Sequence, residues 1–358
     1  MRAGDARVMT TRQASTSGTV KVSPPAVLTI TPATPFAIGL TPLDLADWIT
    51  VDERLGAYLV ERERLLAELR DKVFVEEADT RTAQAEVLEL LAEHLPRRFP
   101  SVYSVEGVPG ARMMRIDCAG AEKADAVSGN RDQSAKRQGE SGQTRLVPLD
   151  DPQTPPLVAA AKLVQEDLVI MRKGEGGWRL VAAVVCFPSS WTLTEKFARP
   201  MQDIHQPVPG YGPGTRPAVL IERIFDNLLV DQPVKRANWS LHHSDALYHP
   251  RGEAVRAARA AGRADPHDET DYDARGYYRR ERQTLRKLPQ SGDILFTIRI
   301  DIDPIDTLRR LPEGREAAAL LVEQLGRMTP EQLRYKGMEA DMATLQEVLA
   351  GIAATKPD

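Results

Sequence analysis

The sequence has little of what marks several specialised classes of protein. Only two cysteines occur among its 358 residues, Cys118 and Cys186, and they are far apart. This scarcity suggests neither a disulfide framework nor a zinc site, and it favours a reducing compartment. The longest apolar run, residues 180–187, is too short to cross a bilayer. The formal net charge of −4 gives no basic field for nucleic acid or anionic lipid. We therefore expect a cytoplasmic protein without nucleic-acid or membrane partners.

Several common catalytic motifs are also missing. The chain contains neither GxGxxG nor GxxxxGK[ST], which leaves Rossmann and P-loop phosphate sites unsupported. It also lacks GxSxG and HExxH, the motifs of many serine hydrolases and zinc proteases. The acidic stretch at 301–306, DIDPID, lacks the central glycine and the final glutamate of a calcium-binding loop. We interpret it as the solvated end of a strand.

The distribution of polar residues divides the chain. Residues 1–34 are rich in Ser, Thr and Pro and predict a disordered tail, with a transit peptide or initiation at Met9 as alternatives. Two polar, Gly- or Ala-rich stretches, at about 119–145 and 250–274, predict insertions. The rest forms one predicted domain over 35–310. The C-terminal helices of 311–358 are expected to pack on this same domain.

Hydrophobic periodicity predicts an α+β protein, with a small antiparallel sheet flanked by helices. Helices are expected over 52–70, over 82–95 with an end at Pro96, and over 218–230. Two strands should flank a hairpin turn at 174–177, and 292–305 alternates like a further strand. Two helices are predicted between 315 and 353, the second with Thr329 as its N-cap and Pro330 at its first position.

The stretch CFPSSWTLTEKFARPMQDIHQPVPGY, residues 186–211, places His205 among Pro200, Pro207 and Pro209. Prolines fix φ and remove donors, so this histidine is expected on a stiffened, irregular segment. A structural, hydrogen-bonded histidine is the first interpretation. Ligation of a haem iron is the second, because a neutral imidazole suits iron and Lys196 and Arg199 are suited to haem propionates.

Two further stretches carry candidate residues. Residues 277–300, YYRRERQTLRKLPQSGDILFTIRI, hold a basic cluster that includes Arg282. It predicts either a solvated helix face with internal ion pairs or an anion-binding patch that runs into a core strand. The stretch KRANWSLHHSD, 235–245, contains Trp239, for which the pattern favours a core position over a pocket wall.

These stretches together resemble the haem-dependent oxidative N-demethylase-like family. The resemblance covers about residues 35–305 and is most specific in the order FPSSW…EK…RP…IHxPVP followed by ERQTLRxLP. It implies a PAS-like fold that holds haem b. In this family, reduced haem and dioxygen are thought to oxidise a small methylated amine, such as dimethylamine, to the demethylated amine and formaldehyde. Electrons would come from NADPH through a separate partner reductase.

Residue by residue, the resemblance implies that His205 is the proximal iron ligand. It leaves Lys196, Arg199 and Arg282 as candidate propionate partners, and Trp191 and Trp239 as candidate pocket walls. One departure is Phe197-Ala198, where a glycine is expected before Arg199-Pro200. The alternatives to an enzyme are a haem-binding sensor without turnover and a haem-free interaction protein.

Overall fold

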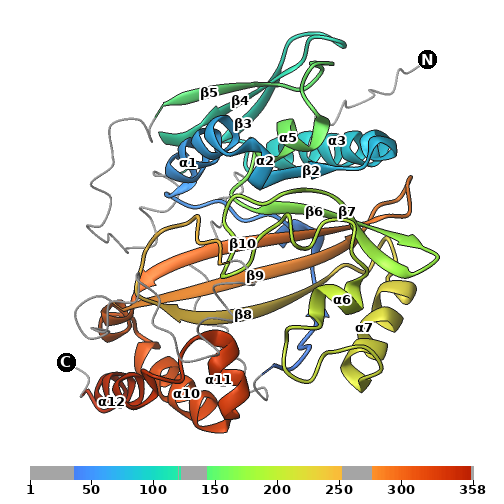
Figure 1. Ribbon diagram of the computed structural model, residues 1–358. Helices are drawn as coiled ribbons and strands as arrows, with labels where there is room; N and C mark the ends of the chain where they lie inside the picture. The colour runs from blue at the N-terminus through green and yellow to red at the C-terminus, as the bar shows by residue number, and fades with distance from the viewer. Residues whose placement is uncertain (1–35, 120, 122–142, 252–275, 356–358) are drawn as a thin grey trace, which may run out of the picture.

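The computed structural model describes residues 36–119, 121, 143–251 and 276–355, and it has two antiparallel sheets flanked by helices (Figure 1). The larger sheet has seven strands in the order β1-β8-β9-β10-β6-β7-β2, and the smaller has the order β3-β4-β5. Their bounds are β1 Thr41–Pro42, β2 Phe74–Glu76, β3 Tyr103–Glu106, β4 Met113–Asp117, β5 Thr144–Pro148, β6 Asp167–Gly174, β7 Gly177–Val184, β8 Val234–His242, β9 Tyr277–Lys287 and β10 Ile294–Pro304. The predicted α+β class is confirmed.

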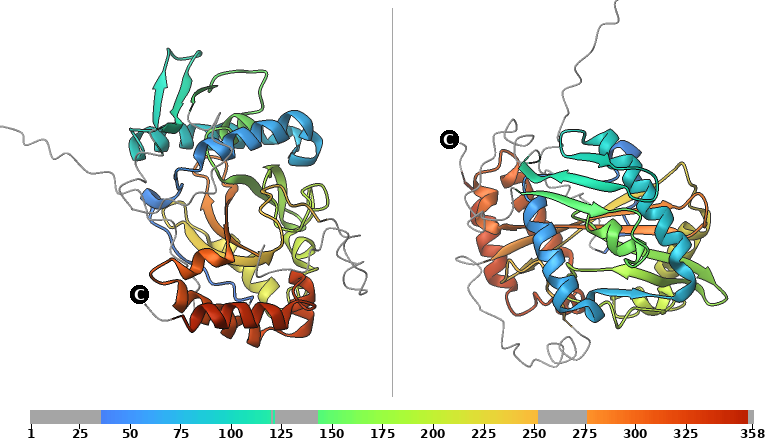
Figure 2. Two further views of the ribbon diagram at one scale, coloured as in Figure 1. Left: turned by 90° about the vertical axis from the view of Figure 1, so that its left-hand side faces the viewer. Right: turned by 90° about the horizontal axis from the view of Figure 1, so that it is seen from above.

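The helices lie around the large sheet, and the strands run between the N-terminal and C-terminal helices (Figure 2). The α-helices are α1 Leu55–Glu68, α2 Arg70–Val73, α3 Arg81–Arg98, α5 Pro156–Ala161, α6 Met201–His205, α7 Arg216–Asn227, α10 Gly314–Arg327, α11 Pro330–Lys336 and α12 Met342–Ala353. The described residues also contain the short 3-10 turns η1 Leu45–Asp47, η2 Ala78–Thr80 and η4 Ile305–Arg309. No helix in the described ranges is long and apolar enough to span a membrane.

Strand β6 is buried on both faces because both sides of the sheet are covered. Leu168 and Ile170 join the core that includes α1, α3 and α5, whereas Val169 and Met171 join the core beneath α6 and α7. Successive side chains of a strand point to opposite faces, so a nearly continuous apolar run is what such a strand requires. The C-terminal helices form a third cluster, which packs against Trp239 and Tyr278.

Local signals placed several elements correctly. The hairpin turn joins β6 to β7 with Gly174 opposite Gly177. Thr329 forms a full capping box at the start of α11, where its hydroxyl accepts from the Gln332 amide and the Gln332 side chain accepts from the Thr329 amide. These motifs act within a few residues, so tertiary contacts do not override them.

Two element predictions are wrong, and one of the two alternatives for residues 277–300 is excluded. Helix α3 continues through Pro96 to Arg98, because a proline in the last turn removes only one backbone bond. The C-terminal region has three helices rather than two, since Gly337 adopts φ +70° and ends α11. Residues 277–287 form strand β9 and not a helix.

Other predictions lie outside the described residues. These are the tail over 1–34 and nearly all of the two insertions, apart from residues at their edges that belong to β5 and to the segment before Arg251. The acidic stretch at 301–306 lies at the end of β10, as expected, but Asp301 and Asp303 pair with Arg54 and other arginines rather than with solvent. The described residues hold no cluster suited to a metal ion.

Candidate haem site

His205 is the last residue of α6, which corrects the prediction of an irregular segment. Pro200 precedes this short helix and Pro207 follows its end. A proline ring is compatible with a helix start and cannot continue the helix, so the two prolines set its length. The imidazole is thus held by a helical turn that packs on β7 through Met201.

The His205 ring is kept in its neutral form. Burial is the main cause that lowers its pKa to about 4, and the charges of Lys196 and Arg236 lower it further. The carbonyl of Met201 accepts a hydrogen bond from the ring. Because one ring nitrogen carries the proton, the other carries the lone pair, which is the form that a metal ligand requires.

Two cations and the Tyr211 ring lie near this imidazole, and Trp191 contacts one of the cations. The ammonium of Lys196 donates to the Ile204 carbonyl at 3.3 Å and lies 5.1 Å from the centre of the Trp191 ring. The Tyr211 ring is 6.3 Å from that of His205, centre to centre, and its hydroxyl donates to the Phe36 carbonyl. Arg236 reaches the same place from β8, and its buried Nε has no hydrogen-bond partner among the described residues. Burial lowers the pKa of Arg236.

Arg236 belongs to a row of polar residues on one face of the large sheet. Opposite residues of paired strands share a face, and Arg236 is opposite Gln283, Asn238 opposite Glu281 and Ser240 opposite Arg279. The preceding row on this face is apolar, with Val234 beside Leu285. We call the following set the polar strip: Arg236, Asn238, Ser240, His242, Arg279, Glu281 and Gln283.

The carboxylate of Glu281 lies in the middle of the polar strip. It is 8% exposed, and its Oε2 accepts from the amides of Gln283 at 2.8 Å and Asn238 at 3.3 Å. Among the described residues, no lysine or arginine forms a direct ion pair with it, but the charges of Arg236, Arg279 and Lys336 act on it from a greater distance. A buried carboxylate with amide partners retains the capacity to bind a cation.

Arg279 has a structural place in the polar strip. Its guanidinium donates to the Ser189 hydroxyl and to the carbonyls of Phe187, Pro188, Ala246 and Leu247, at 2.8–3.2 Å. Burial lowers its pKa to about 10. The guanidinium of Arg279 donates to neutral oxygens of two loops, residues 187–189 and 246–247. Arg279 therefore joins these two loops to the polar strip.

The structure brings one of the predicted partners, Lys196, close to His205, and a second, Trp191, into contact with Lys196. It does not bring the other three there. Arg199 is exposed. Arg282 is opposite Ala237, on the face away from Arg236, and donates to the carbonyls of Asp47 and Trp48. Trp239 packs on the C-terminal helices and donates to Gln324 Oε1 at 2.7 Å, as its predicted core position implies. Whether any of these residues contacts a cofactor stays a prediction.

Sequence reasoning missed Arg236, Glu281 and Gln283. Alternation in RANWSLH places Arg236, Asn238, Ser240 and His242 on one face of a strand, and this signal was available. Their partners on β9 could not be found in the same way, because arginines occur on both faces of that strand.

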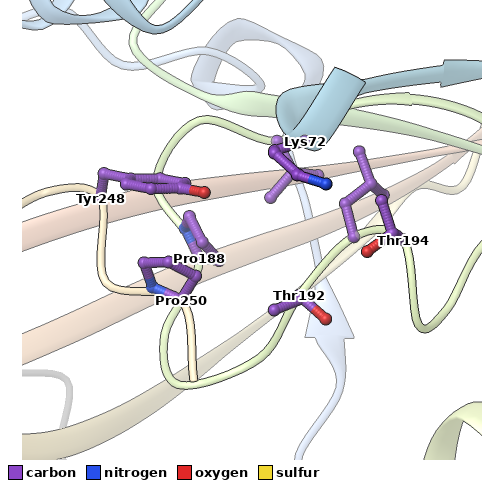
Figure 3. Close-up of a pocket in the computed structure, with 8 residues that line it drawn as sticks. Lys72, Pro188, Thr192, Thr194, Tyr248 and Pro250 are labelled. Carbon is purple, nitrogen blue, oxygen red and sulfur yellow. The ribbon is translucent and has the colours of Figure 1, made fainter. Parts of the chain in front are cut away.

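Two cavities lie outside this site. One, of about 40 Å³, is lined by residues that include Lys72, Thr192 and Tyr248 (Figure 3). The other is an open groove of about 350 Å³ between α3 and β3, with Glu86, Glu89 and Glu93 on its walls.

A comparison with family models matches residues 39–345 to the family described as haem-dependent oxidative N-demethylase, alpha subunit-like. This match covers most of the chain, so the protein belongs to that family. No curated protein matches the chain. The family name indicates a haem-dependent, oxidative N-demethylase-like function.

The residues around His205 fit a haem. A neutral imidazole with a fixed proton is the usual iron ligand, and a buried arginine nitrogen without a partner suits a propionate carboxylate. Lys196 supplies a second cation, and Trp191 and Tyr211 supply flat walls.

Proposed function

We propose that this protein is a haem-dependent oxidative N-demethylase that acts on a small methylated amine, such as dimethylamine. The observation that carries the proposal is the neutral His205 imidazole, with Lys196 and Arg236 beside it and the polar strip on the adjacent sheet face. Haem b bound at His205 would supply one chemistry, the activation of dioxygen with electrons from a reductase that draws on NADPH. We also propose a cytoplasmic location and a PAS-like fold.

The chain's own residues would position the reactants. His205 would hold the cofactor, and Arg236 and Lys196 would pair with its propionates. Glu281 would bind the ammonium form of the substrate, because its buried carboxylate accepts hydrogen bonds from two amides and forms no direct ion pair among the described residues. The carboxylate of Glu281 would also orient the methyl group by fixing the nitrogen that carries it.

An absorption spectrum tests haem binding. Protein produced with haem should show a Soret band that shifts on reduction by dithionite, and His205→Ala should lose or shift that band. His94→Ala is the matched control, since His94 packs against Trp48 on another element. A Soret band that His205→Ala leaves unchanged would falsify the ligand assignment, and colourless wild-type protein would favour a haem-free interaction protein.

Turnover tests the reaction. With a reductase, NADPH and dimethylamine, the wild type should release formaldehyde, and Glu281→Gln should raise the KM for the amine. Gln keeps the shape of Glu281 while it removes the charge. A red protein that binds haem and never releases formaldehyde from any small methylamine would be a sensor instead.

A further inference from the structure

Three side chains at one end of the polar strip form a continuous hydrogen-bonded chain. The Ser240 hydroxyl lies 2.6 Å from His242 Nε2, and His242 Nδ1 lies 3.3 Å from His249 Nε2. The two rings meet edge to face, with centres 4.7 Å apart. A hydroxyl and an imidazole can each accept one proton while they donate another. The three groups therefore suit stepwise proton transfer.

This chain runs from the polar strip to the loop whose residues Tyr248 and Pro250 line the small cavity. His242 is 7% exposed, and Ser240 lies on the same strand face as Arg236 and Asn238. At the other end, His249 lies between Tyr248 and Pro250, which line the cavity of about 40 Å³ (Figure 3). The Ser190 amide donates to the His249 carbonyl at 3.0 Å, so the backbone around this histidine is fixed. A cavity of this size can hold water molecules.

The proposed reaction needs protons at a buried place. When a methylated amine and dioxygen give the demethylated amine, formaldehyde and water, the balance requires two electrons and two protons. The electrons come from the reductase. The protons must reach an oxygen atom of dioxygen through the protein, because bulk water does not enter a buried site freely.

We propose that Ser240, His242 and His249 form a proton relay from the cavity to the reacting oxygen. A water molecule of the cavity gives a proton to His249 Nδ1, His249 passes its Nε2 proton to His242 Nδ1, His242 passes its Nε2 proton to the Ser240 oxygen, and Ser240 gives its hydroxyl proton to the reacting oxygen. Each pass takes up one proton at His249 and delivers one at Ser240, so two passes supply the two protons. Between passes both imidazoles return to their first tautomers. This proposal rests on the proposed oxidative function.

Arg279 would be a positioning residue for the relay. It is opposite Ser240 on β9, and it binds the Ser189 hydroxyl and the carbonyls of Ala246 and Leu247. Ser189 forms a bridge with His249, so this arginine fixes the loop that carries the far end of the relay.

Nitrogen-15 NMR of the imidazoles tests the chain without turnover. In the wild type, one proton should be shared between His242 Nδ1 and His249 Nε2. His249→Gln should lose that signal, whereas His243→Gln should keep it. His243 is the matched control because it follows His242 directly in the sequence and faces a different partner. Its Nε2 lies 3.6 Å from Asp341 Oδ2. If the wild type has no such hydrogen bond, the relay is wrong.

Turnover of the haem-loaded protein then tests the role. Ser240→Ala removes the hydroxyl that binds His242 and leaves both histidines in place. It complements His249→Gln, which could also disturb the loop that carries residue 249. Both variants should form formaldehyde about 100-fold more slowly, as expected for the loss of a positioned proton donor. They should also release hydrogen peroxide and show a larger solvent deuterium isotope effect, and His243→Gln should not.

The two ways of failing are distinct. If the wild type releases formaldehyde and both variants match it, the relay is rejected and the proposed function stands. If the wild type releases none with any methylamine, the oxidative function fails, and the relay as its proton source fails with it.

Discussion

Arg62 of α1 and Asp167 of β6 form an ion pair without solvent access. The Arg62 Nη1 to Asp167 Oδ1 distance is 2.9 Å, and the two side chains are 0% and 1% exposed. Asp167 also accepts the backbone amides of Cys186 and Phe187, at 2.9 and 2.8 Å. One carboxylate therefore joins a helix, the sheet and the first residues of the stretch that leads to His205.

Arg62→Ala should strongly destabilise the protein. It leaves the buried Asp167 without its cation, and removal of one partner of a buried pair costs about 3–5 kcal/mol. Arg64→Ala on the exposed side of α1 should cost under about 1 kcal/mol, because the pairs of Arg64 with Glu61 and Glu68 face solvent. Denaturant unfolding of both variants measures the difference. Equal losses of unfolding free energy in the two variants would show that the buried ion pair stabilises the protein no more than the exposed pairs do.

Much of this fold follows from local patterns in the sequence. The helices of the first hundred residues and the turn at 174–177 have periodicity and turn residues that act over short distances. Strand β9 shows why other parts could not be predicted. Arg279 and Arg280 lie on opposite faces, and each is satisfied by groups distant in sequence, namely the carbonyls of two loops and Asp303. A charged strand is recognisable only once those distant partners are known.

The same limit applies to the site. His205 could be selected from its prolines, but its cation Arg236 comes from a strand some thirty residues later. Lys196 lies close in sequence and was found, whereas Arg282 was selected for its charge and lies on the other face of the sheet. Charge alone does not tell which face of a strand a residue occupies.

The neutral state of His205 should make the stability of the haem-free protein depend on pH. Its folded pKa of about 4 lies below the unfolded value of about 6.5, so the unfolded state binds more protons between these values. Stability should therefore fall as the pH decreases from about 6.5 to about 4. Denaturant titrations across this window should show a smaller fall for His205→Gln. An unchanged pH dependence in that variant would mean that the ring is not held neutral.

Arg236→Met should separate a functional cation from a structural one. The half-buried Arg236 side chain has a buried Nε without a hydrogen-bond partner among the described residues, so its removal should leave the stability of the haem-free protein unchanged or raise it. Haem affinity should fall about tenfold or more, because one charge-assisted hydrogen bond to a propionate is lost. Lys235→Met, on the other face of β8, is the control. A large loss of stability in Arg236→Met would assign it a structural role.

Ala198→Gly should stabilise the protein. Ala198 occupies the position where the family resemblance leads us to expect glycine, and it has φ +60°. A left-handed conformation destabilises the folded state by about 1–2 kcal/mol for a residue other than glycine. Replacement by glycine removes this strain, but it also makes the unfolded chain more flexible, which offsets about 0.4–1 kcal/mol of the stabilisation. We expect a net gain of about 0.5–1 kcal/mol in thermal or denaturant unfolding. A loss of stability would show that the alanine methyl group makes contacts that outweigh its strain.

The attachment of Asp167 to backbone amides has an evolutionary consequence. Every residue except proline carries an N–H group, so this attachment does not depend on which side chains stand at positions 186 and 187. The residues after this point can therefore change while the stretch still leaves the sheet at the same place. Asp167 and Arg62 should accordingly tolerate far fewer substitutions than the loop residues that they hold.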